Sequence, residues 1–215
     1  MSTETGSTDM SNMEEALKAF KAKAFSLIAD EEVRAMAEEV FNFRSLLNSE
    51  TDRGAALMAG SFLDQKLTTL LKRRLVEDKK VSESAFDHAG PLGSFASRID
   101  FSYLIGCLSK SAWRDLQLIR KVRNDFGHVA GPISFEDPAI SQRCKALSFA
   151  GKSVEMDARA KFKRAVMGLL AHIGTATVTT VRLEKALDPQ IPKDMSRSEA
   201  MDLLRKFAEG EMAPS

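Results

Sequence analysis

Hydrophobic residues recur along most of this chain at spacings of three and four positions, which is the period of an amphipathic helix. The clearest stretch begins after Ser49-Glu50-Thr51-Asp52, and its apolar face contains Leu57, Phe62, Leu63, Leu67, Leu70 and Leu71. It ends in the basic run Lys72-Arg73-Arg74, and cations suit the negative end of a helix dipole. No segment alternates apolar and polar residues in the manner of a half-buried strand. The pattern therefore predicts an all-α fold.

Capping signals locate the other helices. A capping box at Ser11-Asn12-Met13-Glu14 opens a helix that breaks near Asp30, and a second helix then leads to Leu47. Further helices are expected over residues 95–108, 111–127, 138–149, 154–187 and 197–209. Their start signals are Ser94 as an N-cap, Asp137-Pro138, and a cap over Ser196 to Glu199. A loop is expected over 79–94, with a short turn at 84–86 and turn punctuation at Gly90-Pro91-Leu92-Gly93. We predict that residues 1–10 form a disordered tail and that 11–210 form one compact bundle of seven or eight helices.

Composition narrows the classes of function. The formal net charge is only +1, so no global field attracts the chain to nucleic acid or to an anionic membrane. A signal peptide, an apolar run long enough to span a membrane and a disulfide framework are all missing from the sequence, which favours a cytoplasmic protein. No glycine-rich phosphate loop, nucleophile elbow or metal-ligand cluster occurs, so neither a cofactor nor a metal is expected.

One position in the helix over residues 111–127 does not fit its surroundings. The wheel gives a core stripe of Ala112, Leu116, Ile119 and Phe126, and Arg123 falls in the middle of that stripe. A cation directed into a core is costly unless it is paired or reaches a wet cleft. Two explanations stay open: an internal ion pair with Asp115 or a glutamate, or a polar cleft that binds an anion.

His128 joins this candidate site if the helix stops at Gly127. Glycine is favoured just past a helix end, where the chain turns left-handed, and such a turn would fold His128 back toward Arg123. Asn124 could orient either side chain. An arginine, an amide and an imidazole together suit a phosphodiester, although a histidine that follows a helix is more often a cap or a surface residue. His88 is expected to fix its loop or to supplement a site under the Gly90-Pro91 turn.

These segments resemble a known family. The stretches Gly90 to Ile99, Asp115 to His128 and Ile133 to Phe135, with Asp52 to Leu75 upstream, resemble the mannitol operon repressor family over roughly residues 45–150. The resemblance implies an all-helical transcriptional regulator. Because the sequence has no helix-turn-helix with a basic exposed second helix, we expect it to act through a protein partner or RNA, as a homodimer, and not by reading DNA sequence directly.

The spacing from Arg123-Asn124 to His128 is also similar to the Arg-x4-6-His motif of HEPN-type helical domains. That resemblance implies a metal-independent endoribonuclease in which Arg123 holds the scissile phosphate, His128 moves the proton and Asn124 orients the site. Arg98, Asp115 and Asp125 are expected to line the same cleft. The sequence thus favours a regulator that is not an enzyme, with a ribonuclease or RNA-binding protein and a structural interaction module as the alternatives.

Overall fold

The computed structural model describes residues 23, 25–151, 156–188 and 196–209, and all regular structure in these ranges is helical. The chain divides into two compact units, residues 1–183 and 184–215. The all-α prediction is confirmed. The predicted capping box at Ser11 and the tail over residues 1–10 lie outside the described residues, and the single domain over 11–210 stays a prediction.

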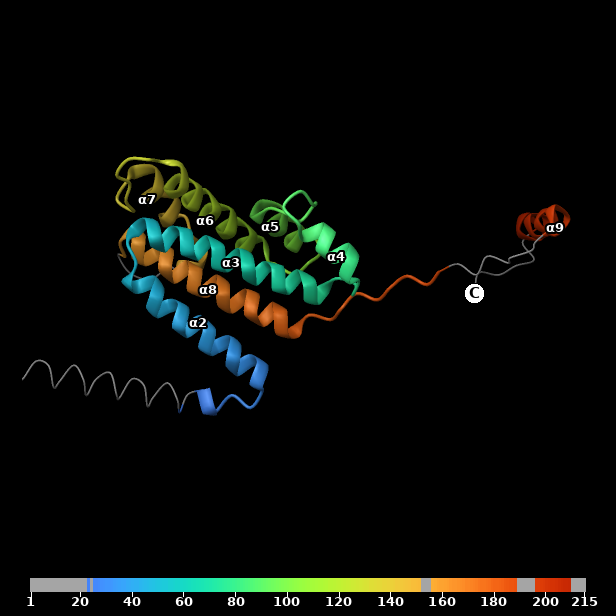
Figure 1. Cartoon of the computed structure of the whole chain (residues 1–215), viewed down its shortest axis with the longest axis horizontal. Helices are drawn as coiled ribbons and strands as arrows, with labels where there is room; N and C mark the ends of the chain where they lie inside the picture. The colour runs from blue at the N-terminus through green and yellow to red at the C-terminus, as the bar shows by residue number, and fades with distance from the viewer. Residues whose placement is uncertain (1–22, 24, 152–155, 189–195, 210–215) are drawn as a thin grey trace, which may run out of the picture. The chain divides into compact units, whose positions relative to one another are not determined.

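The first unit holds seven α-helices and one short 3-10 helix within its described residues (Figure 1). They are α2 (Glu31–Ser49), α3 (Asp52–Arg74), α4 (Lys79–Phe86), α5 (Phe95–Leu104), α6 (Lys110–His128), α7 (Pro138–Lys145), η1 (Ser148–Ala150) and α8 (Ala158–Thr179). The second unit holds α9 (Arg197–Ala208), which begins with the predicted capping box of Ser196 and Glu199 and buries none of its side chains. None of the described helices is long and apolar enough to cross a membrane.

Helix α3 is the central element of the first unit, with α8 against one side and α6 against the other (Figure 1). Its fully buried Ala55, Ala56 and Ala59 allow the neighbouring helices to approach closely. Three buried rings, Phe126, Phe135 and Phe162, then connect α6 to α8 with centroids 5.0 Å apart at each step. Burying this apolar surface is what holds the bundle together.

Side-chain caps explain most helix starts. Asp30 accepts a hydrogen bond from the Val33 amide, which confirms the predicted break before α2. Ser94 opens α5 as predicted and forms a reciprocal capping box with Ser97. Pro138 stands at the first turn of α7 as predicted, but Asp137 does not cap that helix, because its carboxylate accepts from the Ser134 amide instead.

The structure corrects four helix boundaries. The predicted loop over 79–94 contains α4, α5 ends at Leu104 and α7 ends at Lys145. The predicted helix over 154–187 is α8 alone, which begins at Ala158 and stops at Thr179. The chain after α8 caps α3 instead: the Leu183 amide donates to the Arg74 carbonyl at 2.8 Å, and Arg182 donates to the Leu75 carbonyl at 3.0 Å. Residues 177–181 are five β-branched residues in a row, and because such residues disfavour the helix, ending α8 at this point costs little free energy.

Candidate functional site

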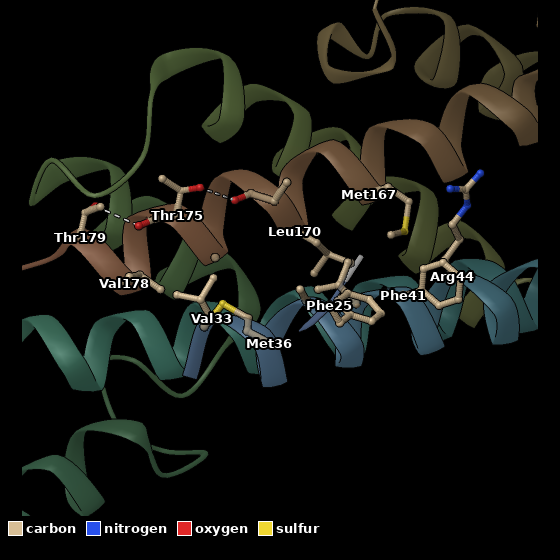
Figure 2. Close-up of a pocket in the computed structure, with 14 residues that line it drawn as sticks. Phe25, Val33, Met36, Phe41, Arg44, Met167, Leu170, Thr175, Val178 and Thr179 are labelled. Carbon is tan, nitrogen blue, oxygen red and sulfur yellow. Dashed lines mark hydrogen bonds between the residues drawn. The ribbon is translucent and has the colours of Figure 1, made fainter. Parts of the chain in front are cut away.

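Two of the hollows in the described part of the chain have opposite character. The first, here called the apolar groove, has a volume of about 530 Å³ and lies between α2 and α8, with Phe25 seated in it (Figure 2). Val33, Met36, Phe41, Met167, Leu170 and Val178 supply its surface. The hydroxyls of Thr175 and Thr179 donate to carbonyls one turn back, at 3.0 and 2.9 Å. Arg44 is the one charged residue among those that line the apolar groove. The groove therefore offers apolar surface for contact and few groups that could bind a polar ligand.

The second hollow, here called the polar cleft, has a volume of about 390 Å³ and lies where α3, the loop before α5 and α6 meet. Its lining residues are Gly60, Ser61, Asp64, His88, Gly93, Ser94, Phe95, Ala96, Arg120, Arg123 and Asn124. Two arginines, an imidazole, an amide and a carboxylate are the groups that bind and orient polar ligands. The polar cleft is therefore the candidate functional site.

Arg98 fixes the wall of the polar cleft from behind. Its guanidinium donates to the Asp64 carboxylate at 2.7 Å and to the Leu92 carbonyl at 2.8 Å. The first bond joins α5 to α3, and the second ties down the loop that carries His88. The Arg98 side chain is only 13% exposed and that of Asp64 27%, so solvent screens their attraction weakly.

The tight turn over residues 90–93 shapes the same wall. The Gly93 amide donates to the Gly90 carbonyl at 2.9 Å, and the Leu92 amide donates to the Ala85 carbonyl at 2.9 Å. A methyl group on Gly93 would lie 2.3 Å from the Asp87 carbonyl oxygen, so only glycine fits this approach of backbone to backbone. The predicted punctuation at Gly90-Pro91-Leu92-Gly93 thus places His88 and Ser94 at the cleft.

Arg123 reaches the polar cleft because α3 has a glycine opposite it. A methyl group on Gly60 would lie 2.7 Å from Cγ of Arg123, so the aliphatic stem of Arg123 rests on the bare backbone of Gly60. The guanidinium continues outward and donates to the side-chain oxygen of Asn124 at 3.1 Å. The wheel places Arg123 in the middle of the core stripe, but in the structure its side chain emerges at an exposed edge and is not sealed in the core.

The charge of the polar cleft is positive. Arg120 is half-buried, and its Nε donates to the Gln117 side-chain oxygen at 3.0 Å. Among the ion pairs of the described residues, none involves Arg120 or Arg123. The carboxylate of Asp64 is already paired with Arg98. Arg120 and Arg123 therefore bring two positive charges to the lining of the hollow, and neither is in an ion pair with a carboxylate of the described residues.

His128 does not lie where the sequence placed it. Among the described residues, the glycines with positive φ are Gly106 and Gly151, and Gly127 is an ordinary helical residue. Helix α6 therefore runs through His128, and the expected left-handed turn at Gly127 is wrong. On a regular helix, His128 points about 140° away from Arg123. The imidazole that shares the cleft with Arg123 is His88, from a different element.

The three other predicted cleft residues support the structure instead of lining the cleft. Asp115 is fully buried, and its carboxylate accepts hydrogen bonds from the amides of Ser148 and Phe149 at 3.1 and 2.8 Å, not from Arg123. Asp125 forms an ion pair with Arg143 of α7. Arg98 stands behind the cleft wall, paired with Asp64. The Arg123–Asp115 pair, one of the explanations left open by the sequence, is absent, because Asp115 anchors η1.

Comparison with known proteins adds two positive findings. A family model described as "Mannitol repressor" matches residues 40–182, which is more than half of the chain. Among solved structures, the "X-ray structure of the MtlR-HPr complex from Escherichia coli" contains a chain that matches with a TM-score of 0.55 at 18% sequence identity. The alignment covers 65% of this chain and 99% of that chain, and at this identity it shows a shared fold. No curated protein matches.

Proposed function

The chain belongs to the mannitol repressor family, and from this premise we propose that it is a cytoplasmic transcriptional regulator that acts by binding a protein partner. The observation that carries the proposal is the family match, joined to a solved relative of the same fold that forms a complex with the protein HPr. The partner we propose is therefore the HPr protein of the organism that encodes this chain. A near-zero net charge agrees with a regulator that does not itself bind a specific DNA sequence.

The experiment measures binding of the full chain to that HPr by isothermal titration calorimetry. We expect a saturable complex, and we expect an operator-sized duplex of the regulated promoter to stay unbound at physiological salt. Specific retention of the duplex by the chain alone would contradict the proposal. Light scattering on the same sample tests the proposed homodimer, since the molar mass must be twice that of one chain.

The exposed position of Arg123 in the polar cleft favours a second candidate, an RNA-binding protein or metal-independent ribonuclease. The test is cleavage and retention of a labelled RNA pool in EDTA. An RNA enzyme requires loss of activity in Arg123→Gln and in either His88→Ala or His128→Ala. Arg114→Gln is the matched control, because Arg114 is an exposed arginine of α6 that does not line the cleft. RNA that is neither cut nor retained rejects this candidate.

A further inference from the structure

The two arginines of the polar cleft have the chemistry that recognises an anion. A guanidinium is a planar fork of donors that matches the oxygens of a phosphate group, and it stays charged at every physiological pH. Arg120 and Arg123 are three residues apart on α6, so their side chains emerge from the same face of the helix one turn apart. Both residues line one hollow, so their guanidinium groups can act on one ligand.

The walls around these arginines are preorganised. Gly60 sets the course of the Arg123 stem, and the Arg98–Asp64 pair holds the opposite wall. The first turn of α5 also borders the cleft, and the backbone amides of Phe95 and Ala96 have no carbonyl partner within the helix. A ligand that enters the cleft therefore meets donors that are already in position, which reduces the entropy lost on binding.

The remaining polar groups of the polar cleft suit hydroxyl groups. Asn124 offers an amide, Ser61 a hydroxyl and His88 an imidazole, and each of them can both donate and accept a hydrogen bond. The volume of about 390 Å³ is in the range of small-molecule sites. An extended RNA strand would instead need a track of cations and stacking rings, and Phe95 is the one aromatic side chain other than the imidazole of His88 at this cleft.

We propose that the polar cleft binds a small phosphate ester that carries several hydroxyl groups, with Arg120 and Arg123 on the phosphate and Asn124, Ser61 and His88 on the hydroxyls. This site goes beyond the proposed function and does not depend on it, because a ligand in the cleft is compatible with any protein partner. The apolar groove between α2 and α8 is unsuited to such a ligand, since its lining has a single cation and no free hydroxyl pair.

The test is calorimetric titration of the full chain with mannitol 1-phosphate, inorganic phosphate and unphosphorylated mannitol. The ester is expected to bind, to raise the melting temperature by mass action, and to bind more tightly than either of the other two probes. Arg120→Gln and Arg123→Gln are each expected to weaken the ester about tenfold, the effect of losing one charge-assisted hydrogen bond. Arg114→Gln, the matched control on α6, is expected to bind as the wild type does.

Three results would overturn the assignment. The first is no binding of any phosphorylated probe to the wild type, and the second is undiminished binding by both cleft variants. The third is retention of a short RNA that is lost in Arg123→Gln, with no binding of the ester. That result would identify the cleft as the RNA-binding site of the second candidate function. The two variants replace exposed or half-buried side chains, and circular dichroism checks that they remain folded. A failed HPr titration would leave all of these outcomes unchanged.

Discussion

The polar cleft and the apolar groove are built on the same bundle but are kept open by different forces. The groove is a gap between two packed helices, α2 and α8, and its shape follows from the volumes of apolar side chains such as Met36 and Leu170. The cleft is bounded by three separate elements that a few polar contacts hold in place, the Arg98–Asp64 pair foremost. Removing packed atoms costs a free energy that grows with the cavity left behind, whereas a polar wall depends on the hydrogen bonds of single side chains.

The two hollows also relate differently to the family. All residues of the polar cleft, from Gly60 to Asn124, lie within the matched range 40–182, whereas Phe25 and the first turns of α2 lie outside it. The cleft is thus part of the framework that the family model describes. The groove depends in addition on the beginning of this chain's own α2.

Replacing Arg98 with alanine is expected to have the largest effect. The change leaves the Asp64 carboxylate and the Leu92 carbonyl without their donor in a largely enclosed position, at a cost of about 3 kcal/mol in the free energy of unfolding. It also frees the loop that carries His88, so the binding of mannitol 1-phosphate is expected to fall further than stability alone explains. Urea unfolding and calorimetry measure the two effects.

Arg73→Ala is the control for that experiment. Arg73 pairs with Glu32 at the surface, where the two side chains are 36% and 57% exposed. An exposed pair of this kind contributes less than about 1 kcal/mol. If both arginine variants lost the same small amount of stability, the polar wall of the cleft would not depend on the Arg98–Asp64 pair.

Leu170→Ala tests the other hollow. Leu170 is 2% exposed and borders the apolar groove, where removing its Cγ and two Cδ carbons is expected to cost about 2 kcal/mol. Because the α2–α8 groove shares no lining residue with the cleft, ester affinity is expected to stay within twofold of the wild type. A large loss of ester affinity would show that the two hollows are mechanically coupled.

Gly60→Ala is expected to change the stability of the fold less than Arg98→Ala and Leu170→Ala do, but to weaken the binding of the ester in the cleft. Alanine favours the helix by about 1 kcal/mol over glycine, which offsets part of the clash with the Arg123 stem. Net stability is therefore expected to change by less than about 1 kcal/mol, while the displaced guanidinium weakens ester binding several-fold. Ester binding as strong as in the wild type would show that the stem of Arg123 can move aside without losing its contact.

The helices of the bundle could be predicted because their signals are local. The caps at Asp30 and Ser94 and the apolar spacing of α6 lie within a few residues of what they determine. The end of α8 is different, since it depends on the carbonyls of Arg74 and Leu75, which lie about a hundred positions away in the chain. No local pattern carries that information, so the predicted helix ran eight residues too far, to Leu187.

The candidate site could be predicted only in part, for the same reason. The wheel singles out Arg123 because it stands in the core stripe, but the exposed course of its side chain depends on Gly60, a glycine of another helix whose role appears only when α3 and α6 are packed. The sequence predicts a cleft position for Asp115, because the amides that donate to its carboxylate, those of Ser148 and Phe149, are remote in the chain. For His88 it predicts a loop-fixing residue or a supplement to a site under the turn at Gly90, and that turn does bring His88 to the cleft.

The packed interior between the two hollows provides the last and smallest test. Cys144 lies in the hydrophobic core, and burial raises the pKa of its thiol to about 12. Burial also raises the pKa of the half-buried Cys107, although nearby Arg74 and a hydrogen bond with Thr180 oppose the rise. Because the thiolate is the reactive form, native Cys144 is expected to resist alkylation at pH 8, and Cys107 to react first.

The raised pKa of Cys144 also gives the stability of the fold a pH dependence of definite sign. A folded-state pKa above the ordinary thiol value of 9.0 means that folding favours the protonated thiol, so this contribution to stability is complete below about pH 9 and is lost as pH rises toward 12. Mass spectrometry after timed iodoacetamide treatment measures both sites, with urea-unfolded protein as the reference. Rapid labelling of Cys144 in native protein at pH 8 would mean that the interior opens locally. Because that interior lies between the two hollows, such an opening would change the shape of both.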